Sequence, residues 1–318
     1  MQLARYTDKD AAAWDGFLSS VPMATFFHTR RFLAYHGDRF QDVSLVLRDE
    51  RGEIIGLFPA AVDPAESQRV VSHPGITFGG LLHDRGLYGD RMIEAFAALR
   101  AHYLESGFEA LRYKAVPYVY HLAPSGDDLY ALFRLGAARY RCDLSSSIDL
   151  VDRRMPSTRR MRGVKKALKG HVSVHEGAEF IVPLWDVLKE NLQKKYDAKP
   201  VHSVEEIVTL HTLFPRHIVF VAALLESEVI AGAVLFISPR VTHVQYIASG
   251  DLGYNLCALD AVFAHCIEQS AERGARYFDF GTSNEQEGQY LNLGLYQFKS
   301  EFGGGGVAYE CYELKLNS

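Results

Sequence analysis

A lysine lies between two aromatic side chains near the end of the chain, where a short helical pattern runs into four glycines. Lys299 directly follows Phe298 and precedes Phe302 by three residues. An ammonium group buried between aromatic rings needs an anionic partner, or its pKa falls. Such a group can stabilise negative charge that develops during a reaction. The alternative is that the side chain passes between the rings and places its ammonium group in water.

A second group of polar side chains follows a strand predicted over residues 108–117. Lys114, Tyr120 and His121 cluster at the end of this strand, where α/β folds often place ligands. We expect Lys114 and Tyr120 to bind substrate. His121 could act as a general base, because the pKa of a free histidine lies near neutrality. The alternative is aromatic packing with His121 at the surface.

His28 and Arg31 begin a predicted helix in the segment FFHTRRF. Both are candidates for binding the substrate, and Arg31 could contact an acceptor phosphate through its guanidinium group. The alternative for Arg31 is an ordinary surface arginine.

Six basic residues occur between Arg159 and Lys169 in the segment TRRMRGVKKALKG. Helical spacing separates a basic face from an apolar face. The basic face carries Arg159, Arg162, Lys166 and Lys169, and the apolar face carries Met161, Val164 and Leu168. Arg159 and Arg162 therefore predict a site for an anion, such as a nucleotide diphosphate or a tRNA backbone. The alternative is a solvated charged surface, which charge runs commonly form.

The chain has 318 residues, which is long enough for two domains, and acidic residues outnumber basic ones. The formal net charge of −5 argues against a protein that binds nucleic acid through a generally basic surface. The 4 cysteines form no C-x-x-C pair, which predicts reduced thiols in a cytoplasmic protein. Residues 1–14 carry charges where a signal peptide needs an apolar core, and no apolar run approaches the roughly 20 residues of a membrane span.

The elements predicted around these residues occur twice in the same order. Each half has a strand, two helices, a hairpin, a strand, a long helix, a strand, a short helix and a final strand. The long helices are expected at about residues 90–107 and 256–273, each with a glycine at its end. The sequence therefore predicts an α/β protein of two tandem domains, residues 1–150 and 151–318, each with a mixed twisted sheet flanked by helices.

This element order resembles the fold of the GNAT acyltransferases. The duplication, the segment TRRMRGVKKALKG and the ending FDFGTSN…LGLYQFKSEFGG resemble the FemAB-like branch of that superfamily. The resemblance covers nearly the whole chain, and its ending is more specific for the branch than for any substrate. It implies two tandem GNAT-like domains and acyl transfer from either acyl-CoA or aminoacyl-tRNA.

The resemblance also implies where an acyl donor binds. The strand HVQYIASG should diverge from the strand YFDFG, and the loop DLGYNLCA should present backbone N–H groups and a helix N-terminus to the pyrophosphate. In this picture Asn255 caps the helix and Gly253 permits close approach. The segment lacks the glycine run of the usual GNAT motif, R/Q-x-x-G-x-G/A, and the alternative is an ordinary helix start. The predicted donor contacts are Tyr246, Ser249, Gly253, Asn255 and Leu256.

Residues near the end of the chain complete the implied site. Lys299 would face the acyl group as its carbonyl oxygen becomes an oxyanion. Tyr296 would protonate the leaving thiolate, as a tyrosine does on the matching GNAT helix. Gly281 and Ser283 would contact the substrate.

Asp279 and Glu285 are alternatives to His121 as the general base, although an inward-facing aspartate is more often a hydrogen-bonded core residue. The chain contains no G-x-S-x-G, P-loop, H-E-x-x-H or G-x-G-x-x-G motif. Its 13 histidines show no ligand spacing, so no metal is predicted.

We therefore expect an N-acyltransferase that moves an acyl group from acyl-CoA to an amine, for example on a nucleotide-linked sugar or a cell-envelope or polysaccharide precursor. The amine would attack the thioester directly, without a serine or cysteine nucleophile. The nearest alternative is a FemAB-type peptidyl transferase that uses aminoacyl-tRNA. The acidic net charge and the absence of the long coiled-coil insertion found in many such enzymes disfavour it. A GNAT-like binding module without catalytic activity is the remaining alternative.

Overall fold

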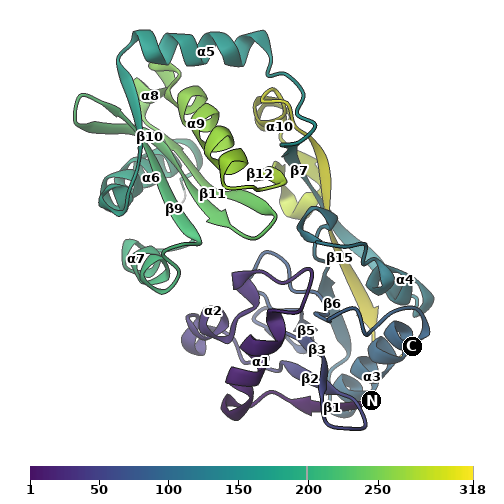
Figure 1. Ribbon diagram of the computed structural model, residues 1–318. Coiled ribbons are helices and arrows are strands. Elements are labelled where there is room, and N and C mark those ends of the chain that lie inside the picture. Colours follow the sequence, from purple (N-terminus) through teal and green to yellow (C-terminus); the bar gives the residue numbers. More distant parts are fainter. Residues whose placement is uncertain (198–199, 318) are drawn as a thin grey trace. The chain divides into compact units, whose positions relative to one another are not determined.

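The computed structural model describes residues 1–197 and 200–317, and the side chains of residues 195 and 196 lie outside that description (Figure 1). The chain forms two compact units. The first unit contains Met1–Asp143, Gln286–Tyr290 and Ala308–Ser318, and the second contains Leu144–Glu285 and Leu291–Val307.

The first unit contains two sheets. Strands β1, β2 and β3 form an antiparallel sheet, and strands β4, β5, β6 and the end of β15 form the other in that order. The bounds are β1 (Gln2–Arg5), α1 (Ala11–Leu18), α2 (Arg30–Ala34), β2 (Leu45–Arg48), β3 (Ile54–Phe58), β4 (Ala61–Asp63), β5 (Glu66–Val71), α3 (Asp90–Glu105), β6 (Ala110–Lys114), α4 (Asp127–Arg134), β7 (Ala138–Asp149) and β15 (Gly305–Lys315).

The second unit is built on one mixed sheet whose strands follow the order β7-β12-β11-β10-β9-β8. Its elements are α5 (Thr158–Lys169), β8 (Val172–Glu176), α6 (Ile181–Tyr196), α7 (Val204–Leu213), β9 (Ile218–Leu225), β10 (Glu228–Ile237), β11 (Val241–Ser249), α8 (Asp251–Leu256), α9 (Ala258–Glu272), β12 (Tyr277–Thr282) and α10 (Leu293–Ser300).

Helices cover both faces of this second sheet. Successive residues of β10 point to opposite faces of the sheet, and each face is packed against a helix. Ala231 and Ala233 belong to the hydrophobic cluster that contains the buried face of α9. Between them, Gly232 faces α6, where a Cβ atom would lie 2.7 Å from the Leu184 side chain. Figure 1 shows α9 and α6 on opposite sides of this sheet. Burying each large apolar side chain in such a layer contributes about 1.5–3 kcal/mol.

The predicted fold class is confirmed: the protein is α/β, with mixed sheets flanked by helices. The predicted long helices correspond to α3 and α9, which lie within two residues of the expected bounds at each end. The domain division at residue 150 stays a prediction.

Strands β7 and β15 each contain residues of both units. The end of β7 pairs antiparallel with β12 in the second unit, and the end of β15 pairs antiparallel with β6 in the first. A strand pattern in sequence predicts extended structure but does not say which sheet the strand joins, because that choice depends on packing against distant residues.

Candidate functional site

Strands β11 and β12 are paired over only part of their length. Their parallel register covers Val241–His243 opposite Tyr277–Asp279. Beyond His243, β11 continues to Ser249 beside β10, with a register shift opposite Val234 and Leu235 that leaves Gln245 as the extra residue of a bulge. This register agrees with the predicted divergence of the two strands.

Lys299 is buried at the end of β12. Its side chain comes from α10, and the residue is 4% exposed. Its Nζ atom donates hydrogen bonds to the carbonyl oxygens of Gly281 at 3.0 Å and Thr282 at 2.7 Å. Among the described residues, the third N–H of this ammonium group has no partner. The alternative in which Lys299 reaches the surface is therefore wrong.

Burial determines the electrostatics of this group. Loss of solvent lowers the pKa of Lys299 to about 8, and the nearby carboxylate of Asp279 opposes the shift only in part. Gly281 has a φ of +74°, a conformation that side chains other than glycine rarely adopt. The turn it makes aims its carbonyl at the ammonium group, so the backbone of β12 fixes the direction of Lys299.

Tyr296 lies one turn before Lys299 on α10 and is half-buried. A Cβ atom at Gly306 would lie 3.1 Å from the Tyr296 hydroxyl oxygen, so this hydroxyl packs close to the start of β15. Helix α10 begins at Leu293 and is capped by Asn292, whose side chain accepts a hydrogen bond from the Leu295 backbone at 3.0 Å. The proton-donor role of Tyr296 stays a prediction.

Ser283 follows β12 directly and is 2% exposed. Its Oγ atom is buried without a hydrogen-bond partner among the described residues, while its backbone N–H donates to the Leu144 carbonyl at 3.0 Å. An unpartnered buried hydroxyl is uncommon in native proteins. The structure thus brings Gly281 together with Lys299 and places Ser283 two residues farther along.

The predicted donor loop is itself a helix, which corrects the sequence analysis. Residues Asp251–Leu256 form α8, and Cys257 joins it to α9 in the left-handed region with a φ of 57°. Asn255 lies inside α8 and is exposed, so it does not cap α9. The polar segment could satisfy its own backbone groups as a helical turn, and Leu256 ends that turn half-buried.

Gly253 is required for packing within the unit. A Cβ atom there would lie 2.4 Å from the Ile230 carbonyl oxygen, so α8 approaches β10 through this glycine. Ser249 is buried, and its Oγ donates to the Gly250 carbonyl at 3.2 Å. The Tyr246 hydroxyl is hydrogen-bonded to His202 Nδ1. Contacts of these residues with a donor remain predictions.

The residues singled out in the first unit have mainly structural partners. His28 is fully buried, and its Nδ1 accepts a hydrogen bond from the Thr25 backbone at 3.0 Å. Burial lowers the pKa of His28 to about 4, so the ring is neutral near physiological pH. The neighbouring Arg31 is exposed on α2. His28 therefore lies in the core, and its predicted contact with a substrate stays a prediction.

Lys114 ends β6, and its ammonium group donates to the carbonyl oxygen of Ile76. Burial lowers the pKa of Lys114 to about 8. Tyr120 is 5% exposed, and its ring centroid lies 4.5 Å from that of Phe78. His121 is half-buried, with Nε2 3.0 Å from the Val116 carbonyl oxygen. The roles predicted for these residues stay predictions.

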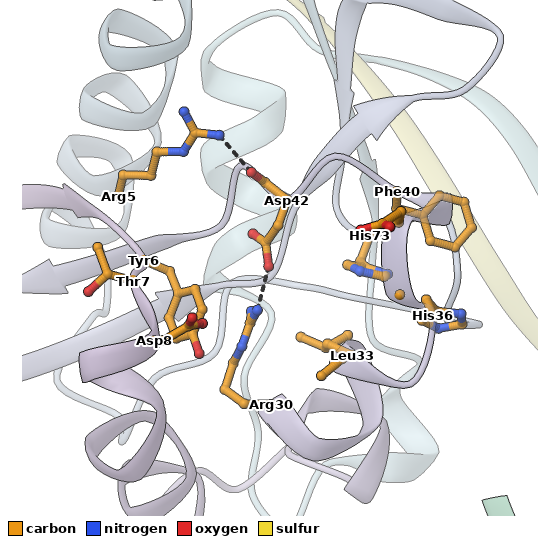
Figure 2. Close-up of a pocket in the computed structure, with 13 residues that line it drawn as sticks. Arg5, Tyr6, Thr7, Asp8, Arg30, Leu33, His36, Phe40, Asp42 and His73 are labelled. Carbon is orange, nitrogen blue, oxygen red and sulfur yellow. Dashed lines mark hydrogen bonds and ion pairs between the residues drawn. The ribbon is translucent and has the colours of Figure 1, made fainter. Parts of the chain in front are cut away.

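A cavity of about 560 Å³ in the first unit contains none of the predicted site residues. It lies between the start of the chain and α2, and its centre holds an ion pair between Arg30 and Asp42 (Figure 2). The Arg30 guanidinium also lies 3.5 Å from the centre of the Tyr6 ring, and Arg5 donates to the Asp42 carbonyl oxygen at 2.8 Å. These contacts hold the walls of the cavity together.

Helix α5 turns a different face inward from the one predicted. Arg160, Gly163 and Ala167 are buried, whereas Met161 and Leu168 are 40% and 62% exposed. The reason is an approach to α9: a Cβ atom at Gly163 would lie 2.5 Å from the Asp260 carboxyl carbon.

Arg160 stabilises this approach through two ion pairs, at 3.0 Å to Asp260 and 3.0 Å to Glu301. Arg159 and Arg162 are exposed, as a surface anion site requires, although their binding role stays a prediction.

Sequence reasoning missed a cluster beside Lys299. His243 Nδ1 lies 2.7 Å from Asp279 Oδ2, and Ser145 donates from its Oγ to Asp279 Oδ1 at 2.5 Å. Asp279 was considered only as an alternative base and Glu285 as another; Glu285 is exposed and accepts from Asn292 at 2.8 Å. No local pattern predicts the cluster, because three separate strands supply its members.

Two further classes of feature bear on the function. Within residues 1–197 and 200–317, no group of three or more histidine, cysteine, aspartate or glutamate side chains could hold a metal ion. In the same part of the chain, no helix has the length and apolar character needed to cross a membrane.

Comparisons with known proteins identify a family match for part of the chain and solved structures with a similar fold. Residues 153–299 match the model of the acetyltransferase (GNAT) domain family. A search of curated protein sequences returned no significant match. Among solved structures, FemX has a TM-score of 0.71 and 12% identity, covering 100% of this chain and 98% of FemX.

Two other solved structures resemble the chain over nearly its full length. L-PGS from Bacillus licheniformis has a TM-score of 0.61 and 13% identity, covering 96% of this chain and 91% of that one. A tandem GNAT protein from the clavulanic acid biosynthesis pathway has a TM-score of 0.59 and 10% identity, covering 99% and 98%. At such identities the likeness concerns the fold. Residues 153–299 therefore form a domain that matches the acetyltransferase (GNAT) family, and the whole chain shares the fold of FemX and of the tandem GNAT protein.

Proposed function

We propose that the protein is an N-acyltransferase that moves an acyl group from acyl-CoA to an amine, such as one on a nucleotide-linked sugar or a cell-envelope precursor. The observation that carries the proposal is the buried ammonium group of Lys299 at the point where β12 leaves β11. A fixed positive charge in a water-poor environment is suited to an acyl carbonyl oxygen that gains negative charge. Because acyl-CoA is a donor available in the cytoplasm, the proposal implies action there.

The proposed steps need no covalent enzyme intermediate. The amine nitrogen attacks the thioester carbon, and the third N–H of Lys299 donates to the oxyanion. The bulge at Gln245 leaves a backbone residue outside the regular ladder, on the strand that borders the divergence, and its N–H is a second candidate donor. Tyr296 would protonate the thiolate as the C–S bond breaks.

A second candidate function is transfer from aminoacyl-tRNA. The exposed cations of α5, including Arg159 and Arg162, favour it, because phosphate contacts are made by such side chains. The acidic net charge of −5 opposes it.

The test is donor binding by isothermal titration calorimetry with acetyl-CoA and, separately, with aminoacylated tRNA. We expect acetyl-CoA to bind with one site per chain and tRNA to bind weakly, with an affinity that falls steeply as salt is added. Specific tRNA binding without any acetyl-CoA binding would reverse the choice of donor.

A further inference from the structure

The cluster of Ser145, Asp279 and His243 has the arrangement of a base held by a carboxylate. Asp279 is fully buried, and its two oxygens are occupied by Ser145 Oγ and His243 Nδ1. A carboxylate that accepts from Nδ1 fixes the tautomer in which Nδ1 carries the proton and Nε2 is free to accept one. His243 Nε2 has no hydrogen-bond partner among the described residues.

The repeated fold provides an internal control for this cluster. The parallel strands β5 and β6 of the first unit have three residue pairs in register, as β11 and β12 do in the second. At the third pair, where the second unit has His243 and Asp279, the first unit has Val71 and Arg112. The fold can therefore be built without a histidine and an aspartate at these positions.

The position of His243 places its free nitrogen beside the group that Lys299 contacts. His243 is the last residue of β11 in register with β12. A Cβ atom at Gly281 would lie 3.2 Å from His243 Cε1 and 3.8 Å from Nε2, so the glycine leaves this edge of the ring uncovered. Lys299 donates to the carbonyl oxygen of the same glycine at 3.0 Å. The imidazole of His243 and the ammonium group of Lys299 therefore both lie beside Gly281, where β11 and β12 separate.

We infer that His243 is the general base of the acyl transfer and that Asp279 and Ser145 position it. The inference rests on the function proposed above. Nε2 takes one proton from the attacking ammonium group, and the freed nitrogen pair bonds to the acyl carbonyl carbon. The C–S bond then breaks and its electrons leave with the thiolate. Tyr296 protonates the thiolate, and the second nitrogen proton replaces the proton that Tyr296 has given up. His243 returns its proton to solvent, so the products are the amide, the free thiol and one proton.

The test compares His243→Gln with the wild type, using acetyl-CoA as donor and two small amines as acceptors. Methylamine is largely protonated near neutral pH and needs a base, whereas hydroxylamine is largely unprotonated and does not. We expect His243→Gln to lower kcat with methylamine by about 10²–10⁴-fold and to affect hydroxylamine far less. His211→Gln is the matched control, because His211 is a half-buried histidine of the same unit whose Nδ1 lies 3.0 Å from a backbone carbonyl oxygen.

A second measurement does not depend on turnover. Nitrogen-15 spectra of the histidine rings, assigned through His243→Gln, should show His243 protonated at Nδ1, and added acetyl-CoA should shift the Nε2 signal. Asp279→Asn should abolish this tautomer preference, which a merely structural contact elsewhere in the core would not change.

The outcomes separate the inference from the proposed function. If calorimetry detects no acetyl-CoA binding to the wild type, the proposed donor is wrong. If acetyl-CoA binds but the His243 signals do not move, the inference is overturned and the proposed function stands. Equal losses with methylamine and hydroxylamine would also overturn it, since they would indicate a defect in positioning or folding.

Discussion

The parallel strand pairs of the two units begin alike and end differently. Strands β5 and β6 stay in register up to Val71 and Arg112, and the following loop then closes onto β6. Ser72 N donates to the Arg112 carbonyl at 2.8 Å, and Gly79 N and Gly80 N donate to the Lys114 carbonyl at 3.2 and 3.1 Å. The backbone of the first unit therefore fills the place beside the end of β6.

Strand β11 of the second unit continues for six residues beyond His243 without pairing with β12. The side chains of His243, Asp279 and Lys299 gather at this point. At the end of the parallel pair β5 and β6, backbone hydrogen bonds of the following loop cover the strand. At the end of the parallel pair β11 and β12, titratable side chains lie instead. This difference supports placing the proposed acyl transfer in the second unit.

Two lysines, the half-buried Lys114 and the buried Lys299, make the comparison sharper. Burial lowers the pKa of both Lys114 and Lys299 to about 8, and both donate to backbone carbonyl oxygens. A lowered pKa alone therefore does not distinguish a reactive position from a structural one. The two positions are distinguished by the strands beside them, because the loop after β5 hydrogen-bonds to the end of β6 whereas β11 does not pair with the end of β12.

Among the changes that test this comparison of the two units, the largest effect is expected on turnover by Lys299→Met. This change keeps most of the stem and removes the charge, so kcat should fall by about 10²–10³-fold while acetyl-CoA still binds. Lys299→Arg should recover little, since a planar guanidinium does not replace a compact ammonium group. Steady-state kinetics checks this, with the exposed Lys189→Met as control. Near-normal turnover of Lys299→Met would show that Lys299 is as structural as Lys114, and the two units would no longer differ in this respect.

The pH dependence of stability should be similar for the two lysines. The pKa of Lys299 is about 8 in the native protein and near 10.5 when unfolded, so between these values the unfolded state binds more protons. The wild type should therefore gain stability relative to Lys299→Met as pH rises from about 8 toward 10.5, by up to about 3 kcal/mol. Lys114→Met should give the same trend. Denaturant titrations across this range provide the measurement.

Only Lys299 should couple this titration to turnover. The wild-type kcat should decline as pH rises through about 8, because the ammonium group that stabilises the oxyanion loses its proton. If Lys114→Met abolished this decline in kcat and Lys299→Met retained it, the proposed acyl transfer would belong to the first unit instead of the second.

A smaller effect is expected from Gly79→Ala in the closing loop of the first unit. A Cβ atom there would lie 2.1 Å from the Ser72 carbonyl oxygen, so the loop must move away from β6. We expect the free energy of unfolding to fall by about 1–3 kcal/mol, the usual cost of overpacking. Chemical denaturation checks this. No loss of stability would show that the closed end of β5 and β6 is not tightly packed.

The smallest effect on stability is expected for the double change Arg159→Glu and Arg162→Glu. Both side chains are exposed on α5, and exposed charges contribute little to folding, so thermal unfolding should shift by no more than a few degrees. The apparent KM for an anionic acceptor should rise. An unchanged KM would identify this face as solvated surface and leave the second unit's chemistry confined to the end of β12.

Local periodicity was enough to predict the main elements. The face of α9 made by Leu259, Val262, Phe263, Cys266 and Ile267 is buried because apolar residues recur at helical spacing. The same reasoning failed for α5. Its buried side contains Arg160 with two ion pairs and a glycine against Asp260, and hydrophobicity alone ranks such residues as exposed.

The candidate site was predicted only in part. Lys299 could be recognised because a lysine between phenylalanines conflicts with its surroundings, and Gly281 lay in a segment already assigned to the site. His243 and Ser145 could not be recognised, because nothing in the residues around either one indicates which distant strand will lie beside it.

The sequence by itself determined the element order, the duplication and the presence of a charged side chain in an aromatic helix, since these depend on neighbours along the chain. The tertiary structure decided that the end of β7 pairs with β12 and the end of β15 with β6. It also decided that His243 meets Asp279 and that Lys299 donates to Gly281 instead of reaching water. These outcomes depend on strand register, and register is set by the packing of whole faces because a shift of one residue would turn every side chain to the opposite side of the sheet.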